Sequence, residues 1–573
     1  MLIKFVAMAT VATMALGMGQ PVLAQAASGA YLAGRHAAVR NDYTEAAHYY
    51  AQALAEDSGN VELLESTTLA YLSLGQIDRA IPLARMLQER NQTSQVAHLA
   101  VTAWLANEED YAALLELPED ATGMGPWVDG LVKAWAEVGQ GDMTAAIARF
   151  DALSQETGMQ GFVLYHKALA LASVGDFESA EEILGGDAVG AMAQTRRAII
   201  AHARVLAQLD RREDALTVLR TSFGETLDPE LEALVEALGS GAEVPYDTVR
   251  TAKEGIAEVF FTFGTVLRSE AAGDYYVLLY TRIARHLVPD HVDALLMTAD
   301  LLENLDQHAL AIDVYKSIPA SDPAYHAAEL GRAETLRRSG QPEQAIEVLQ
   351  QLSRSHDDVP IVFSTLGDLL RAQEDYQGAI AAYDRALELA PEDERLGWFL
   401  HYSRGIALER SGEGEAAEKD FRAALALNPE QPQVLNYLGY SLVEQNRNLD
   451  EALDMIERAV AASPDSGYIV DSLGWAFYRL GRYEEAVDQM ERAVELMAVD
   501  PVVNDHLGDV YWAVGRQREA EFQWRRALSF IDYAGEDTDT EADPARIRRK
   551  LDVGLDAVLK DEGAPPLKPA NEG

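Results

Sequence analysis

Small and apolar residues recur along most of the chain with a period of about 34 residues. Gly474 and Ala486 return 34 positions later as Gly508 and Ala520. The alanines at the equivalent position are Ala46, Ala80, Ala146, Ala180, Ala215, Ala311, Ala345, Ala379, Ala417 and Ala452. A period of this length predicts a stack of repeated structural units rather than a single globular core.

Each period contains two amphipathic stretches separated by a polar turn, such as the one at Gly481, and this pattern predicts a pair of helices. Gly474 and Ala486 are expected where the two helices approach closely, with aromatic residues such as Phe421 beside them. Pro429 is expected to end a second helix, because proline has no N–H with which to continue it. Since one pair cannot bury its own apolar face, neighbouring pairs must stack.

The aromatic and proline positions make the pattern more specific. The run Ala417, Phe421, Ala424 and Pro429 matches the run Ala379, Tyr383, Ala386 and Pro391. This pattern resembles the tetratricopeptide repeat. The resemblance covers most of residues 30–530 and implies an all-α fold. The expected architecture is a right-handed superhelix, or α-solenoid, of about 12 to 14 helical hairpins with a concave inner surface.

The repeat is interrupted over residues 223–256. Residues 228–238 predict an extra helix, and residues 239–245, with two glycines and a proline, predict a loop or hinge. We place a sub-domain boundary here, although a degenerate repeat would produce the same break in the pattern. The expected organisation is an N-terminal array at 27–222, the interruption at 223–256 and a C-terminal array at 257–533.

The first residues differ from all that follow. Lys4 is the only charged residue up to position 26, an apolar run extends to Met18, and Ala24-Gln25-Ala26 offers a cleavage site. These features are typical of a secretory signal peptide over residues 1–26. A membrane anchor or a buried first helix is the alternative. We expect cleavage near Ala26 and an exported, periplasmic chain.

The end of the chain also departs from the repeat. Residues 534–560 begin with an acidic loop, which extends from Gly535 to Asp543 and contains five acids and no base. The stretch 545–559 has a helical pattern and is expected to cap the last repeat. Residues 561–573 are expected to be disordered.

The chain of 573 residues is strongly acidic, with 93 Asp and Glu against 47 Lys and Arg and a net charge of −46. Such a charge disfavours binding to nucleic-acid phosphates and to anionic lipid. Cysteine is absent, which excludes disulfides, Cys-ligated metal and Cys-linked lipid. We therefore expect neither nucleic acid nor a direct lipid anchor.

The sequence offers no familiar catalytic motif. It lacks H-E-x-x-H, G-x-S-x-G and G-x-x-x-x-G-K-[ST], which mark zinc proteases, serine hydrolases and nucleotide-binding loops. His286 and His291 flank a proline, but no third ligand follows at a suitable spacing. We predict no enzyme activity, no cofactor and no metal site, although an active site built from distant residues stays open.

Tetratricopeptide arrays bind partners along the first helix of each pair, so the resemblance points to that face in the last four strong repeats. Aromatic residues and arginine dominate protein interfaces, and Asn and Asp can bond the backbone of an extended peptide. The predicted groove consists of Phe399, Tyr402, Asn436, Tyr440, Tyr468, Asp471, Trp475, Tyr478, Arg479, Asp505 and Trp512. Packing between repeats is the alternative for Trp475 and Trp512, whereas Trp524 is expected in the core.

The stretches 435–440 and 469–481 are more specific within this family. They resemble long exported tetratricopeptide proteins of Gram-negative bacteria, some of which are lipoprotein adaptors for a periplasmic carboxyl-terminal processing protease. The resemblance implies a scaffold that binds a protein or an extended peptide segment and presents clients to an envelope protease or a cell-wall enzyme. The absent cysteine departs from the lipoprotein members. The alternative is a structural component of a surface-polysaccharide or envelope export machine.

Overall fold

The computed structural model describes residues 20–90, 92–118, 124–156, 158–224, 227–390, 394–534 and 542–567, with the backbone alone at 20–27, 394–395 and 532–534. Every regular element in these residues is a helix, which confirms the predicted all-α fold. Within them, α1 to α12 form six hairpins, α14 to α17 form two and α20 to α29 form five, thirteen in all. This number lies within the expected range.

The chain divides into two compact units, Met1–Val348 (unit 1) and Leu349–Gly573 (unit 2). The division falls inside α19 (Pro342–Ser355). The interruption expected at residues 223–256 therefore lies within unit 1 and does not coincide with the division between the compact units.

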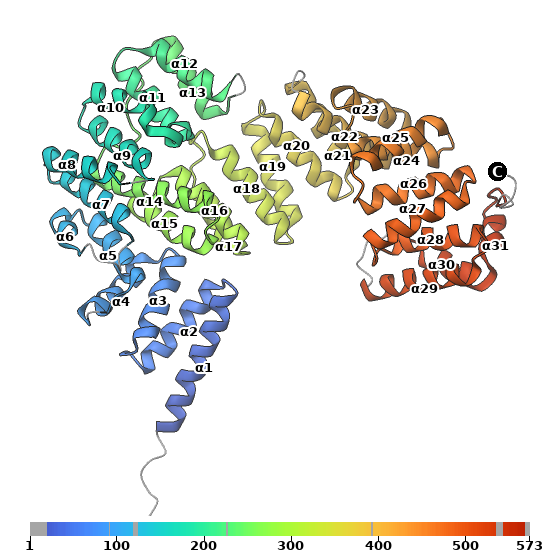
Figure 1. Cartoon of the computed structure of the whole chain (residues 1–573), viewed down its shortest axis with the longest axis horizontal. Coiled ribbons are helices and arrows are strands. Elements are labelled where there is room, and N and C mark those ends of the chain that lie inside the picture. The colour runs from blue at the N-terminus through green and yellow to red at the C-terminus, as the bar shows by residue number, and fades with distance from the viewer. Residues whose placement is uncertain are drawn as a thin grey trace, which may run out of the picture. The chain divides into compact units, whose positions relative to one another are not determined.

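In unit 1 most consecutive helices pack as neighbours in chain order (Figure 1). The helices are α1 (Gln20–Val39), α2 (Tyr43–Glu56), α3 (Val61–Ser73), α4 (Ile77–Glu89), α5 (Gln95–Asn107), α6 (Tyr111–Glu116), α7 (Pro126–Gly139), α8 (Met143–Ser154), α9 (Gln160–Ser173), α10 (Phe177–Leu184), the 3₁₀ helix η1 (Asp187–Gln194), α11 (Arg196–Gln208), α12 (Arg212–Phe223), α13 (Pro229–Ser240), α14 (Ala252–Ser269), α15 (Asp274–Leu287), α16 (Val292–Asn304), α17 (His308–Tyr315) and α18 (Tyr325–Arg338).

Unit 2 is also built of stacked hairpins and ends in two shorter helices. Its helices after α19 are α20 (Pro360–Ala372), α21 (Tyr376–Leu389), α22 (Glu394–Arg410), α23 (Gly414–Leu427), α24 (Pro432–Glu444), α25 (Leu449–Ala462), α26 (Gly467–Leu480), α27 (Tyr483–Leu496), α28 (Pro501–Ala513), α29 (Gln517–Ala534), α30 (Pro544–Val553) and α31 (Leu555–Asp561).

Short turns join the two helices of a hairpin. After α7, Gly141 takes a φ of 79°, and the next residue, Asp142, accepts a hydrogen bond from the backbone N–H of Ala145 at 3.0 Å. Aspartates cap α6 and α21 in the same way, at Asp110 and Asp375. A residue with positive φ reverses the chain, and the aspartate supplies an acceptor for the first turn of the next helix.

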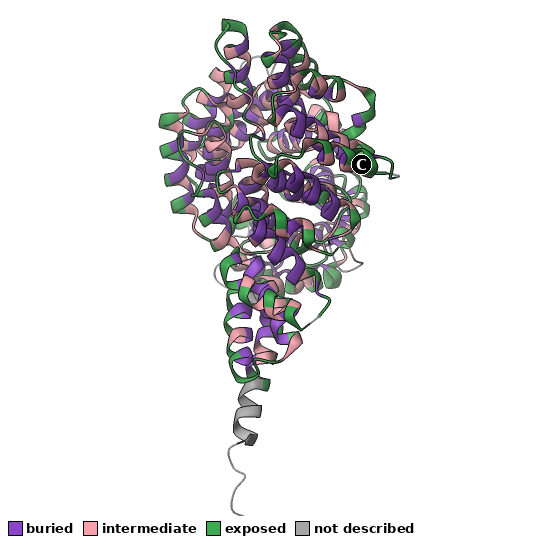
Figure 2. Ribbon diagram, turned by 90° about the vertical axis from the view of Figure 1, so that its left-hand side faces the viewer, coloured by how far each residue is buried: buried purple, intermediate pink, exposed green. Residues whose placement is uncertain are grey.

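Glycines allow the two helices of a hairpin to approach closely, as the sequence predicts. A Cβ at Gly405 would lie 2.6 Å from the Phe421 ring, and a Cβ at Gly508 would lie 2.4 Å from the Trp524 ring. Trp524 is fully buried, which confirms its expected place in the core. Buried residues follow the faces along which the helices pack (Figure 2).

The interrupted segment contains a helix where an extra helix is expected. That helix is α13, which spans Pro229–Ser240. The loop that follows is attached to unit 1, because Gln208 Nε2 donates a hydrogen bond to the Val244 carbonyl at 2.6 Å and Val249 is buried in the core. A hinge role for residues 239–245 stays a prediction.

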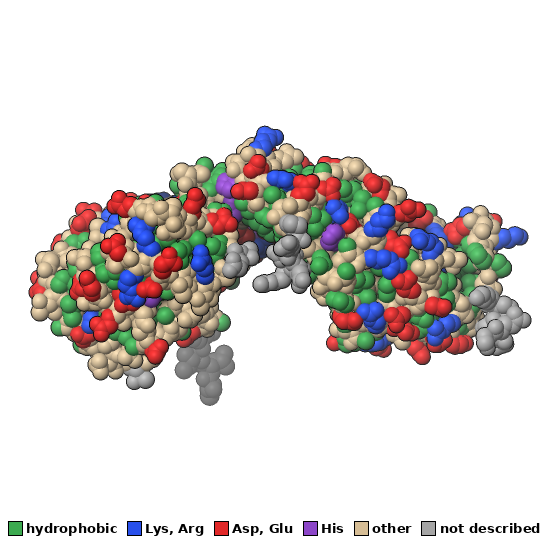
Figure 3. Space-filling model, turned by 90° about the horizontal axis from the view of Figure 1, so that it is seen from above, with side chains coloured by type: hydrophobic (Ala, Val, Ile, Leu, Met, Phe, Trp, Pro, Cys, Tyr) green, Lys and Arg blue, Asp and Glu red, His purple; other side chains and the backbone are tan. Residues whose placement is uncertain are grey.

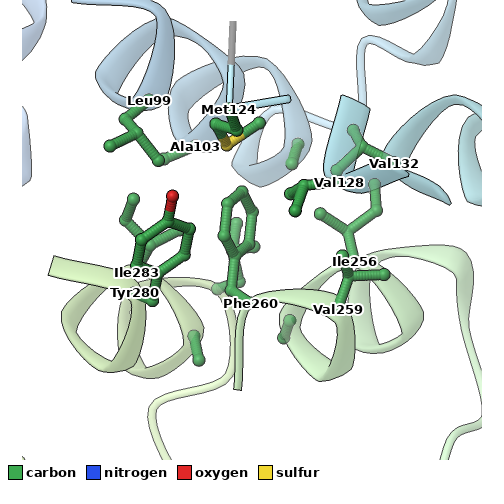
Figure 4. Packing of buried hydrophobic residues seen from close by; sticks show 14 of the residues in the cluster. Leu99, Ala103, Met124, Val128, Val132, Ile256, Val259, Phe260, Tyr280 and Ile283 are labelled. Atoms are coloured by element: carbon green, nitrogen blue, oxygen red, sulfur yellow. The ribbon is translucent and has the colours of Figure 1, made fainter. Parts of the chain in front are cut away.

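After this loop, the hairpin of α14 and α15 packs against α3, α5, α7 and α9, the first helices of four consecutive hairpins. Figure 4 shows Phe260 and Tyr280 of the hairpin facing Leu99, Ala103 and Val128 of α5 and α7. All five side chains are buried. The chain thus covers its own first-helix face in unit 1.

Both ends of the chain are described only in part. Residues 1–19 of the expected signal peptide lie outside the described range, and α1 runs past the expected cleavage site at Ala26. Residues 535–541 of the acidic loop and 568–573 of the tail also lie outside it. The single capping helix expected over 545–559 is instead two helices, α30 and α31, because Gly554 takes a φ of 83° between them.

Candidate functional site

Unit 2 contains a groove of about 590 Å³ along the first helices of four hairpins, α22, α24, α26 and α28. Consecutive repeats place the same face of each first helix on the same side of the stack, so equivalent positions line the groove together. The predicted residues that line it are Tyr402, Asn436, Tyr440, Tyr468 and Asp471. The structure therefore brings these five residues to one surface.

Two amide side chains of α24 line the groove. Asn436 is 6% exposed, and its Oδ1 atom has no hydrogen-bond partner among the described residues. Gln433 Oε1, one turn earlier, is also buried and has no partner there. A buried acceptor without a donor costs about 1–3 kcal/mol. These two oxygens are therefore unsatisfied acceptors in the wall of the groove.

Tyrosine rings surround the amides. Tyr402 and Tyr437 pack edge to face with ring centroids 6.1 Å apart, and the Tyr437 hydroxyl donates to Glu409 at 3.3 Å. Burial and the negative charge of Glu409 raise the pKa of Tyr437 to about 12, so this ring is neutral near pH 7. Tyr468 is 46% exposed and is the most accessible tyrosine of the groove.

A hydrogen-bonded ion pair also lines the groove, with Nδ1 of His506 3.0 Å from Oδ2 of Asp471. The Trp475 ring stacks on His506 with centroids 4.1 Å apart, and its Nε1 donates to Glu444 at 2.7 Å. Burial lowers the pKa of His506, but the negative charges of Asp471 and Asp505 outweigh burial and raise it. The pair therefore favours the imidazolium form.

Several lining residues were not predicted from the sequence, among them Tyr437, Met497 and His506. His506 follows Asp471 by 35 residues, which is one repeat plus one position. Tyr437 comes directly after Asn436. The prediction took the same single position from each repeat. It missed such residues because neighbouring positions of a helix also line a groove.

Six predicted residues do not line the groove. They are Phe399, Trp475, Tyr478, Arg479, Asp505 and Trp512. Tyr478 is buried and stacks on Trp475 with centroids 4.8 Å apart. Arg479 lies beside this stack and pairs with Glu444 at 2.7 Å. Phe399 packs on the adjacent Trp398, with centroids 6.0 Å apart.

The C-terminal helices of the chain cover Asp505 and Trp512. Lys550 of α30 is buried and donates hydrogen bonds to Asp505 at 2.9 Å. The Trp512 indole N–H donates to Asp556 at 2.9 Å, and a Cβ at Gly554 would lie 2.7 Å from the Trp512 ring. Contacts with α30 and α31 therefore account for the positions of Asp505 and Trp512.

The corresponding face of unit 1 is filled by α14. The Tyr165 hydroxyl of α9 donates to Glu258 at 2.9 Å, and Arg197 Nε lies 2.7 Å from the same carboxylate. Burial raises the pKa of Glu258, but Arg197 and His291 outweigh burial and lower it to about 2. Because these contacts are all made between residues of this chain, the first-helix face of unit 1 is already occupied. The candidate site is therefore the groove of unit 2.

The rest of the described surface shows neither a metal site nor a helix that could cross a membrane. Within it, no group of three or more His, Cys, Asp and Glu side chains is arranged to hold a metal ion. No helix among the described residues is long and apolar enough to cross a membrane. On the face shown in Figure 3, acidic and basic side chains are interspersed, whereas nucleic-acid binding requires a basic patch or stripe.

Comparison with known proteins identifies the repeat. Matches to the tetratricopeptide repeat family cover residues 31–94, 278–326, 330–394, 402–467 and 444–501. A TPR repeat-containing protein of Pseudomonas aeruginosa is 29% identical over 184 residues, which are 32% of this chain and 30% of that protein. The human protein O-mannosyl-transferase TMTC1 is 25% identical over 173 residues, 30% of this chain and 20% of that protein. The chain thus matches less than a third of either relative's length.

Among solved structures, the crystal structure of the APC/C hetero-tetramer Cut9–Hcn1 is similar. The match covers 78% of this chain and 96% of that chain, at 16% identity and a TM-score of 0.34. The periodic sequence, the stacked hairpins and the family matches lead to one conclusion: the chain contains tetratricopeptide repeats, and such repeats imply a scaffold for protein–protein interaction.

Proposed function

We propose that the protein is an exported scaffold of the bacterial periplasm that holds a partner protein by an extended segment in the groove of unit 2. The observation that carries this proposal is the groove itself, with the unpartnered acceptor oxygens of Gln433 and Asn436 among tyrosine rings. An extended peptide presents backbone N–H donors at regular spacing, and tyrosine rings accept side chains of many kinds.

The contrast between the two units supports placing the partner in unit 2. In unit 1 the first-helix face is covered by α14 and α15, whose Phe260 and Tyr280 are buried. A partner at that face would have to displace this hairpin and expose its apolar surface to water. The groove of unit 2 can accept a segment without such a rearrangement.

The wider role that we propose is the presentation of clients to an envelope protease or a cell-wall enzyme. It is supported by the signal-peptide pattern of residues 1–26 and by the resemblance of residues 398–530 to exported adaptors of Gram-negative bacteria. Because cysteine is absent, attachment to a membrane would come through the partner. In this role the protein binds and positions other proteins and carries out no chemistry itself.

Site-specific photo-crosslinking tests the proposal. The photo-reactive residue p-benzoylphenylalanine replaces Tyr440, which lines the groove. The matched control places it at Phe522 of α29, an aromatic side chain that is 63% exposed. Both variants are irradiated in the bacterium that makes the protein, the periplasm is separated from the cytoplasm, and crosslinked proteins are identified by mass spectrometry.

A periplasmic protein that crosslinks at Tyr440 and not at Phe522 supports the groove, and its identity as a protease or a cell-wall enzyme supports the wider role. Subunits of an export machine at Tyr440 favour the structural alternative. Equal crosslinking at both positions contradicts binding in the groove, and a cytoplasmic location contradicts export.

A further inference from the structure

The groove of unit 2 carries more acidic than basic side chains. Its carboxylates are Glu409, Glu444, Asp471 and Asp500, and its basic side chains are Arg410 and His506. The whole chain has the same bias, with a net charge of −46. A cleft lined mainly by one sign of charge raises the local concentration of ligands of the opposite sign.

Three of these carboxylates have an oxygen atom that makes no hydrogen bond or ion pair among the described residues. Glu444 uses Oε1 alone for its bonds to a tryptophan and an arginine. Glu409 uses Oε2 to accept a tyrosine hydroxyl and to pair with Arg410 at 3.9 Å. Asp500 uses Oδ1 to cap α28. The remaining oxygens can accept charge-assisted hydrogen bonds from Lys or Arg side chains.

The tyrosines add a second attraction for a cation. The four in the groove lining are Tyr402, Tyr437, Tyr440 and Tyr468. An ammonium or guanidinium group is attracted to the face of a tyrosine ring by the ring quadrupole. Carboxylates and aromatic faces on one surface therefore favour the same class of side chain.

An apolar area lies in the same groove. Met497, Val502 and Val503 line it where α28 begins, and Val499 in the adjoining loop is 72% exposed. Burying an apolar or aromatic side chain of a ligand here would remove this surface from water.

Resting on the proposed function, we propose that the groove binds an extended segment that carries Lys or Arg side chains beside an apolar or aromatic residue. The cations pair with Glu409, Glu444 and Asp500 and lie against the tyrosine rings. The apolar residue packs on Met497 and Val502, and backbone N–H groups donate to the amide oxygens of α24.

Fluorescence anisotropy of the full chain with three labelled peptides of equal length tests the inference. The first carries lysines on both sides of a phenylalanine. The second has glutamate and the third has glutamine in place of each lysine. Binding is measured for the wild type, for Asn436→Ala and for the double variant Glu409→Gln/Asp500→Asn. The matched control, Asp488→Asn/Glu495→Gln, removes two exposed acids from α27.

We expect the lysine peptide to bind most tightly and the glutamate peptide most weakly. Glu409→Gln/Asp500→Asn should weaken the lysine peptide about fivefold, as two partly exposed ion pairs allow, and leave the glutamine peptide unchanged. Asp488→Asn/Glu495→Gln should leave all three unchanged. Equal weakening of the lysine peptide by both double variants would show nonspecific attraction to an acidic protein and overturn the inference.

The remaining outcomes separate this inference from the proposed function. If the glutamine or glutamate peptide binds as tightly as the lysine peptide and Asn436→Ala weakens it, the groove binds peptides but does not select cations. If no peptide binds and Tyr440 gives no crosslink, the inference and the proposed groove function fail together. Binding that Asn436→Ala leaves unchanged would place the peptide outside the groove.

Discussion

Lys550 and Asp509 form a buried ion pair, with Nζ of Lys550 2.6 Å from Oδ1 of Asp509. Asp505 lies 2.9 Å from the same ammonium group, so one cation serves two carboxylates. The ammonium also lies 5.7 Å from the centre of the Trp524 ring. These contacts join α30 to α28 and α29, so a buried charge cluster helps to attach the C-terminal cap to the last hairpin.

We expect Lys550→Met to loosen this cap, because the change leaves Asp505 and Asp509 buried without their shared cation. Removing one partner of a buried ion pair costs about 3–5 kcal/mol. Hydrogen exchange followed by mass spectrometry should show faster exchange in α28 and α30. Lys560→Met, at an exposed lysine of α31, is the control and should exchange like the wild type. Unchanged exchange in Lys550→Met would mean that the cluster does not hold the cap.

Gly255→Ala should destabilise the packing of α14 in unit 1. A Cβ at Gly255 would lie 2.2 Å from the ring of Trp135, which is fully buried, and overpacking of this kind costs about 1–3 kcal/mol or more. The measurement is hydrogen exchange of α14 and α7. The control is Gly239→Ala in α13, where nothing lies within 4 Å of the new Cβ, so stability should hold or rise. Equal exchange in both variants would contradict the close contact.

The hairpins could be predicted because the contacts that form them lie within one period. Gly405 and Phe421 are 16 residues apart, as are Gly508 and Trp524. The same pair of positions therefore recurs in each copy, and the repetition makes the signal visible in the sequence. This is also why Trp524 could be placed in the core.

The contacts that decide which faces stay free could not be read from the period. Tyr165 and Glu258 are 93 residues apart, and Lys550 and Asp505 are 45 residues apart. Neither distance is a multiple of the repeat. Both contacts depend on where an extra hairpin or the C-terminal cap packs against the stacked repeats. Asp505 occupies the right row for a groove, but α30 covers that row.

Unit 1 should lose stability as the pH falls from about 6.5 to about 4, because His166 is buried as a neutral ring. Trp135 Nε1 donates to Nδ1 of His166 at 3.4 Å, so Nε2 of His166 donates to Thr262 Oγ1 at 3.0 Å. Burial lowers the pKa of His166 to about 4, against the opposing effect of Glu258. In this window the unfolded chain binds a proton that the folded chain does not. The contribution of neutral His166 to the free energy of unfolding is fully present above about pH 6.5 and amounts to about 3 kcal/mol.

Urea denaturation of the wild type and of His166→Gln at several pH values checks this linkage. Glutamine keeps hydrogen-bonding groups at this position but does not titrate. The free energy of unfolding should fall further in the wild type than in His166→Gln between about pH 6.5 and about pH 4. Parallel curves for the two proteins would show that His166 does not control this pH dependence.

Arg282 is a buried cation of a different kind. Its Nε donates to the Ser73 carbonyl at 3.1 Å, and no carboxylate among the described residues pairs with it. Burial and the charge of Arg285 lower the pKa of Arg282 to about 9, although Tyr43 acts in the opposite direction. Because an unpaired buried charge is costly, Arg282→Met should keep the free energy of unfolding within about 1 kcal/mol or raise it.

Parallel urea denaturation of Arg282→Met and Lys550→Met compares the two kinds of buried cation. Each variant replaces a long cation with an apolar side chain. Lys550→Met leaves Asp505 without its cation and Asp509 with only Arg546 and the Trp524 N–H as partners. Arg282→Met leaves only a backbone carbonyl without its donor. We therefore expect a clear loss in Lys550→Met alone. A loss in Arg282→Met as large as in Lys550→Met would mean that the bond to Ser73 and the packing of the side-chain stem outweigh the cost of burying its charge.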